Sequence, residues 1–139
     1  MKLNATIKYL MIFFLFAAMG CEETVITPDP AFTVGKVSTF RINQLYTSDD
    51  GENTLIIKEI SDSRCPEGLV CIWQGEVTVK GEWTDSNNKS TFEIHSVVNQ
   101  QDKSPEGFSI KIVDAQPYPK YGTDSKPEDL RVALLIQKN

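Results

Sequence analysis

Residues 76–83 read EVTVKGEW, and this stretch decides the fold class because its apolar side chains recur at every second position. One face of the stretch carries small or apolar residues, namely Val77, Val79, Gly81 and Trp83. The alternate positions are polar or charged. A period of two is typical of a β-strand with one buried face. We therefore expect a strand here whose odd-numbered residues face a hydrophobic core.

Further segments repeat the alternation at residues 36–45, 91–95, 108–112 and 130–137, and residues 55–60 form a short apolar run. Clusters of Asp, Asn, Ser, Gly and Pro separate these segments, and such residues favour chain reversals. The pattern predicts an all-β domain of about six to seven strands over residues 33–139. An antiparallel, immunoglobulin-like β-sandwich and a small barrel both satisfy it, because strand periodicity does not distinguish them.

The first twenty residues differ in character from the rest of the chain. Lys2 and Lys8 precede an apolar run over residues 9–19. A membrane-spanning helix needs about 20 apolar residues, so this run is too short to cross a bilayer. A positive start followed by a short apolar run is typical of a secretory signal peptide, which we expect over residues 1–20. An N-terminal core helix or a short membrane anchor is the less favoured alternative, because the run is apolar on every side.

Residues 18–21 read AMGC and resemble the bacterial lipobox, in which small residues precede a cysteine that receives diacylglycerol. The resemblance implies cleavage before Cys21 and lipidation of its thiol, followed by a flexible tether over residues 21–32. Pro28 and Pro30 favour an extended chain in that tether. Glu22 and Glu23 resemble the short surface-export signal of Bacteroidota lipoproteins. We therefore expect a protein of the cell envelope, held at the outer membrane by its N-terminal lipid.

The number of cysteines supports this assignment independently. Of the three cysteines in the chain, Cys65 and Cys71 remain once Cys21 is assigned to the lipid. Export places the remaining pair in an oxidising compartment, so we expect a disulfide between them. A catalytic redox pair is the alternative, but its usual CxxC spacing differs from the wider gap found here.

Residues 62–76 read DSRCPEGLVCIWQGE and carry the densest pattern in the chain. We expect a compact loop closed by the disulfide, with the next strand starting at Cys71. Trp73 shares a period-two face with Val77 and is expected to pack inward beside the bridge. Asp62 and Arg64 flank the loop, where they can pair with each other or cap its backbone.

The same stretch resembles a motif of small exported bacterial lipoproteins of unknown function, which reads D-S-R-C-P, four residues, then C-x-W-x-G. Besides the two cysteines, the motif includes Asp62, Arg64, Pro66, Trp73 and Gly75. A Pro-Tyr-Pro segment at 117–119 and the alternating residues 130–136 also fit these proteins, so the resemblance covers most of the domain. It implies a β-sandwich-like fold and carries no known activity.

The net charge of the chain and its set of potentially catalytic and metal-binding residues disfavour several classes of function. The formal net charge of −5 becomes −7 once Lys2 and Lys8 leave with the signal, and an acidic domain disfavours nucleic acid as a partner. His95, the single histidine, is expected on the surface, and the sequence places no nucleophile beside it. One histidine and two oxidised cysteines cannot complete a tetrahedral zinc site. We therefore expect no metal, no other cofactor and no enzymatic activity.

The remaining candidates are binding residues. Tyr118 and Tyr121 lie in a proline-rich loop, where their rings can stack on a sugar, fill a partner's pocket or fold back over the sandwich. We expect a binding or accessory module with an envelope protein or a glycan as its partner. The alternative is an envelope hydrolase inhibitor or a structural protein that acts through the Cys65–Cys71 loop.

Overall fold

The computed structural model describes residues 30–86, 88–97, 102–123 and 125–139. The predicted signal peptide, Cys21 and most of the predicted tether lie outside the described residues. The elements in chain order are β1 (Ala31–Phe32), β2 (Val37–Arg41), β3 (Leu45–Ser48), β4 (Thr54–Asp62), β5 (Val77–Thr84), β6 (Lys89–His95), β7 (Phe108–Gln116), the 3-10 turn η1 (Pro127–Asp129) and β8 (Arg131–Lys138).

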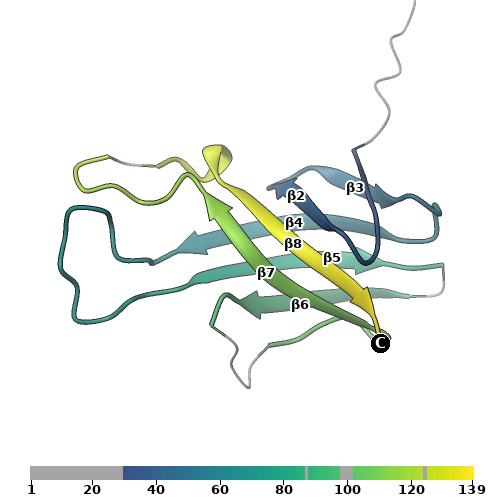
Figure 1. Cartoon of the computed structure of the whole chain (residues 1–139). Coiled ribbons are helices and arrows are strands. Elements are labelled where there is room, and N and C mark those ends of the chain that lie inside the picture. The colour runs from purple at the N-terminus through teal and green to yellow at the C-terminus, as the bar shows by residue number, and fades with distance from the viewer. Residues whose placement is uncertain (1–29, 87, 98–101, 124) are drawn as a thin grey trace, which may run out of the picture.

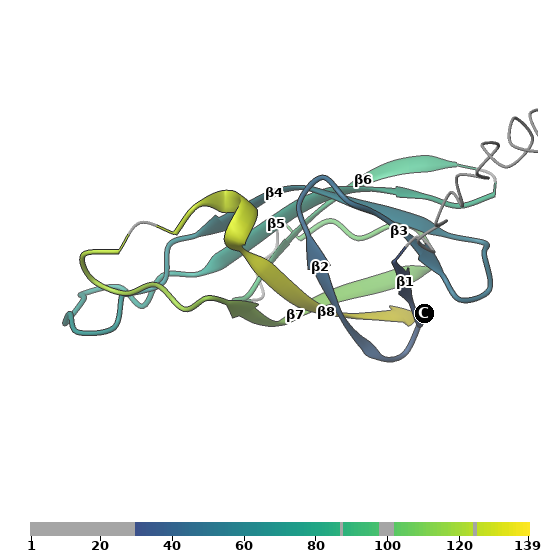
Figure 2. The same ribbon diagram turned by 90° about the horizontal axis from the view of Figure 1, so that it is seen from above.

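The strands form two sheets that pack face to face, as Figures 1 and 2 show. The larger sheet has the order β1-β3-β4-β5-β6, and the smaller has the order β2-β8-β7. Paired strands are antiparallel, except that β1 and β3 run parallel. The predicted all-β fold is confirmed. Of the two predicted architectures, the sandwich and the small barrel, the structure has the sandwich. The described residues contain eight strands rather than six or seven.

The core forms where the alternation predicts it. β5 buries the face that carries Val77, Val79 and Trp83, and β8 buries Val132 and its alternate neighbours. The Trp83 ring lies 4.7 Å from the ring of Phe108, measured between centroids, so a side chain of β5 contacts one of β7 in the opposite sheet. The buried side chains join in one cluster drawn from residues 32 to 136, so the segment from residue 30 onward contains a complete core.

Two predicted boundaries need correction. The single strand expected over residues 36–45 is two strands in different sheets, because Asn43 adopts a left-handed conformation with a φ of 58° and turns the chain. The predicted tether extends to residue 32, but the domain begins before that residue. Ala31 and Phe32 form β1 beside β3, and the Phe32 side chain is buried, so the last residues of that segment belong to the domain.

The middle of β5 is shaped by a glycine. Gly81 pairs with Ile57 on one side and with Phe92 on the other, and the register with β4 shifts after Ile57 so that Lys58 forms a β-bulge. A Cβ atom at Gly81 would lie 2.5 Å from Cζ of Phe92. The absence of a side chain at Gly81 therefore leaves room for the Phe92 ring.

The register also locates where the chain enters the domain. Ala31 pairs with Thr47, Thr47 with Thr54, and Thr54 with Thr84, so these residues share one end of the larger sheet. The loop between β4 and β5 leaves from the opposite end, where Asp62 pairs with Val77. The eight residues of β5 separate the two ends by about 25 Å at the usual rise of a strand.

Candidate functional site

The hairpin of β4 and β5 continues beyond the sheet as a narrow two-stranded ribbon. The Ser63 N–H donates to the Glu76 carbonyl at 2.8 Å, and the Cys65 N–H donates to the Gln74 carbonyl at 3.0 Å. Residues 65–74, which we call the tip loop, close this ribbon. In Figure 1 the tip loop is the teal loop that extends furthest to the left, away from the N-terminal end of the domain.

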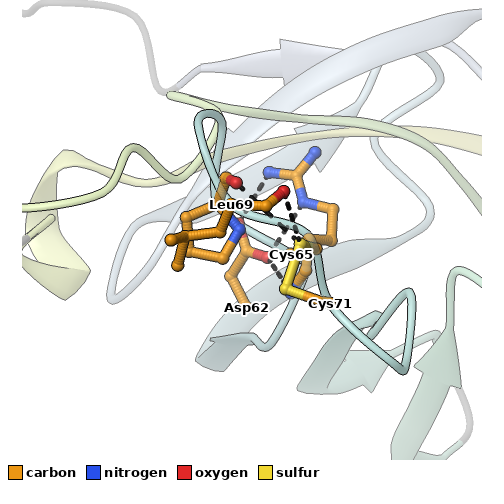
Figure 3. The surroundings of a disulfide bond; sticks show 6 residues. Asp62, Cys65, Leu69 and Cys71 are labelled. Carbon is orange, nitrogen blue, oxygen red and sulfur yellow. Dashed lines mark hydrogen bonds and ion pairs between the residues drawn. A yellow bond between two sulfur atoms is a disulfide. The ribbon is translucent and has the colours of Figure 1, made fainter.

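A disulfide between Cys65 and Cys71 closes the tip loop, with 5.9 Å between the two Cα atoms (Figure 3). This bond is the predicted one. Within the closed ring, Gly68 has a φ of 91° and the Leu69 N–H donates to the Pro66 carbonyl, which forms a turn. Closing so short a loop contributes about 2 kcal/mol through the entropy lost by the unfolded chain.

Gly75 separates the tip loop from β5. Its φ is 68°, and a Cβ atom there would lie only 1.9 Å from the carbonyl oxygen of Ser63. No other residue fits this conformation and this close approach without distortion. The prediction that the strand starts at Cys71 is therefore wrong, because β5 starts at Val77.

Asp62 and Arg64 form a two-pronged ion pair at the base of the tip loop. The Arg64 Nε lies 2.9 Å from Oδ1 of Asp62, and Nη2 lies 2.6 Å from Oδ2. Nη2 also donates to the Ala115 carbonyl of β7 at 2.8 Å, so the arginine connects the ribbon to the smaller sheet. The Asp62 carboxylate accepts the hydrogen bonds from Nε and Nη2, and this is the main reason that the pKa of Arg64 is raised. The predicted pairing of these two residues is confirmed.

The proline-rich loop after β7, of which the structure describes residues 117–123 continuously, braces the tip loop from one side. The Glu67 N–H donates to the Pro119 carbonyl at 2.9 Å, and the Tyr121 N–H donates to the Glu67 carbonyl at 3.3 Å. The Arg64 guanidinium carbon lies 4.4 Å from the centre of the Tyr118 ring. Of the two predicted binding tyrosines, Tyr118 is thus half-buried against Arg64, whereas Tyr121 is exposed beside the tip loop.

Trp73 contradicts the sequence prediction. Its side chain is 84% exposed, so it does not pack inward beside the disulfide. The period-two face does not extend past Gly75, where the left-handed backbone reorients the chain. The exposed side chains of this region form a group that we call the apolar tip, and it consists of Leu69, Val70, Ile72, Trp73 and Tyr121.

The backbone of the tip loop is also open to a partner. Within the described part of the chain, the N–H and C=O groups of residues 70–73 have no hydrogen-bond partner. An exposed segment with unpaired backbone groups can accept another polypeptide by hydrogen bonding. The tip loop therefore presents apolar side chains and backbone polar groups together.

Three side chains of the apolar tip, Leu69, Val70 and Ile72, are not among the site residues that the sequence predicts. A signal for them does exist, because residues 68–75 carry no charge although Glu67 and Glu76 flank them. Pro66 precedes this uncharged stretch in a turn-forming context. This apolar stretch lies in and directly after the disulfide-closed turn and before β5 starts at Val77, so it has no sheet to bury it and is exposed.

His95 is not the surface histidine that the sequence predicts. Its side chain is only 8% exposed, and Nδ1 lies 2.7 Å from Oδ1 of Asp102. Lys103 pairs with Glu93 of β6 through backbone hydrogen bonds, so the chain after β6 folds back beside that strand. Among the described residues, no hydroxyl or thiol hydrogen-bonds to the His95 ring, so this pair has no nucleophile beside it.

Metal sites and relatives give no further guide to function. Within the four described ranges, no group of three or more His, Cys, Asp or Glu side chains is arranged to hold a metal ion. In that same part of the chain, no helix is long and apolar enough to cross a bilayer. Comparison with protein-family models, with curated proteins and with solved structures finds no match. The role of the apolar tip must therefore be inferred from its own geometry.

Proposed function

We propose that this chain is a lipid-anchored lipoprotein of the cell envelope whose β-sandwich is a non-enzymatic binding or accessory module. The observation that carries the proposal is the apolar tip, held out on a braced and disulfide-closed ribbon. Large apolar side chains on a folded domain mark an interaction surface when they are contiguous. The anchor itself is proposed from the lipobox resemblance at Cys21.

Rigidity supports a binding role for the tip loop. The disulfide, the Asp62–Arg64 pair and the hydrogen bonds to the proline-rich loop all restrain its backbone. A loop that is ordered before binding loses little entropy when a partner docks, which increases affinity. Trp73 and Tyr121 are the side-chain types that most often dominate binding energy.

The orientation of the domain fits an anchored module. The chain enters the domain at Ala31, at one end of the larger sheet, and the tip loop leaves from the other end. A lipid on Cys21 would attach the Ala31 end to the membrane. The apolar tip would then be displayed away from the point of attachment, at the outer membrane if the expected localisation holds.

Replacing Cys21 by serine should release the protein from membranes and leave the signal peptide uncleaved. Serine has no thiol for the lipid, and the acidic domain has no basic patch that would bind anionic headgroups instead. Fractionation of cells into membrane and soluble parts, followed by mass measurement, tests this. Cys65→Ser, which should retain membrane attachment, is the control, and persistent attachment of the Cys21→Ser protein would refute the anchor.

The binding role is tested by photo-cross-linking in intact cells. A photoreactive residue at Val70 should give discrete adducts with an envelope component. The same residue at Val37, an exposed apolar position on β2, should give none. Equal labelling at both positions, or none at Val70, would contradict a binding role for the tip loop.

A second candidate is an inhibitor of an envelope hydrolase. The unpaired backbone of residues 70–73 favours it, because a rigid loop with free N–H and C=O groups can enter an extended cleft. The cross-linking experiment separates the two candidates, since an inhibitor would be found attached to a hydrolase.

A further inference from the structure

We propose that the apolar tip is a self-association surface, through which two copies of the chain join tip to tip about a two-fold axis. The inference rests on the proposed function, in that the apolar tip is taken as the binding surface, and it names the partner. A two-fold contact places the same patch of each copy against itself, so a patch that is apolar and self-complementary is suited to it.

The backbone of the tip loop favours a polypeptide over a bilayer as the occupant. The N–H and C=O groups of residues 70–73 have no partner within the described part of the chain. Lipid tails cannot hydrogen-bond to these groups, so burial in a bilayer would leave them unsatisfied at a high cost. The same segment of a second copy offers both donors and acceptors, and the axis would bring the two segments together.

The charges around the apolar tip also permit a second copy. Residues 68–75 carry no charge, and at their edge Glu67 and Lys120 lie side by side with 3.9 Å between carboxylate and ammonium. Glu76, at the other flank, is half-buried, so the exposed charges of the rim are one acid next to one base, which is complementary to its own two-fold image. Two acidic chains can therefore approach through this end without like charges meeting at the contact.

The area of the apolar tip is suited to a weak dimer. Aromatic side chains bury roughly 150–250 Å² each, so Trp73 and Tyr121 offer roughly 300–500 Å² per copy, and the three aliphatic side chains extend this area. Two copies would bury roughly 1,000 Å², which is at the low end of specific interfaces. We therefore expect association in the micromolar range. Because the tips point away from Ala31, the two anchored ends would lie at opposite ends of the dimer.

The two tryptophans provide a direct readout. Trp73 is exposed in the apolar tip, whereas Trp83 is buried in the core. Residues 22–139, which include the complete core, would be studied by sedimentation velocity from about 1 μM to about 200 μM. We expect a monomer–dimer equilibrium with a blue shift in tryptophan emission as the dimer forms. Val70→Asp should weaken association roughly tenfold or more, and Val37→Asp should leave it unchanged.

Several results would overturn the inference. A monomer at every concentration would do so, and so would a dimer that Val70→Asp does not weaken. A monomer whose tryptophan emission shifts only when phosphatidylcholine vesicles are added would assign the apolar tip to the bilayer. Because Val70 is fully exposed, its variant should fold, and Ile72→Ser, at another exposed position, provides an independent check. In cells, a Val70 adduct with a different envelope protein would preserve the proposed function and refute self-association, whereas an adduct with a second copy supports both.

Discussion

Replacing Gly81 by alanine should destabilise the domain by about 3 kcal/mol, although the change adds a single methyl group. The new Cβ atom would lie 2.5 Å from the carbonyl oxygen of Ile56 and 2.5 Å from Cζ of Phe92. The Phe92 ring can shift, but the carbonyl belongs to the paired strand β4 and cannot move without breaking the ladder. Thermal unfolding should show a midpoint lower by roughly 15 °C in a domain of this size.

The effect of Gly81→Ala can be separated from effects on the unfolded chain. Gly81 does not have a positive φ, so alanine fits its backbone and on its own would stabilise the domain slightly by restricting the unfolded state. Lys80→Ala, at the neighbouring half-exposed position, should change stability by less than about 1 kcal/mol. Combining Gly81→Ala with Phe92→Leu should cost less than the sum of the two single changes, because the shorter side chain relieves part of the clash. Strict additivity would contradict the proposed contact.

The sequence predicts the buried faces of this domain well, because alternation records burial directly. In β5 every second residue is small or apolar, and the structure buries the same residues. The sequence does not predict which strands share a sheet. Nothing in residues 36–45 shows that Asn43 transfers the chain from one sheet to the other, since the turn depends on a conformation that asparagine tolerates without requiring.

The features of the candidate site likewise fall into those that the sequence predicts and those that it does not. The disulfide and the Asp62–Arg64 pair could be predicted because they depend on local spacing. The exposure of Trp73 could not be predicted from the alternation, because one left-handed residue at Gly75 ends the period on which the prediction relied. The support from Pro119 to Glu67 joins residues far apart in sequence, and no local pattern reports such a contact.

Replacing Arg64 by alanine should destabilise the domain by about 3 kcal/mol, because it leaves a nearly buried carboxylate without its partner. The Asp62 side chain is only 7% exposed, and that of Arg64 is 15% exposed. Alanine removes both prongs of the ion pair, the hydrogen bond to the Ala115 carbonyl and the contact with the Tyr118 ring. Denaturant unfolding of residues 22–139 measures the loss. Hydrogen exchange should show the amides of Glu67 and Tyr121 opening more readily, since the proline-rich loop loses its contact with the ribbon.

The matched control is Lys120→Ala, which removes an ion pair between the tip loop and the proline-rich loop. The Glu67–Lys120 pair is exposed on both sides, so its loss should cost less than about 0.5 kcal/mol. Asp62→Asn combined with Arg64→Ala should recover part of the stability, because the unpaired charge is then absent. If Arg64→Ala cost no more than Lys120→Ala, the arginine of the motif would not hold the tip loop in place. The rigid presentation of Trp73, on which both the binding role and the self-association depend, would then lack its main support.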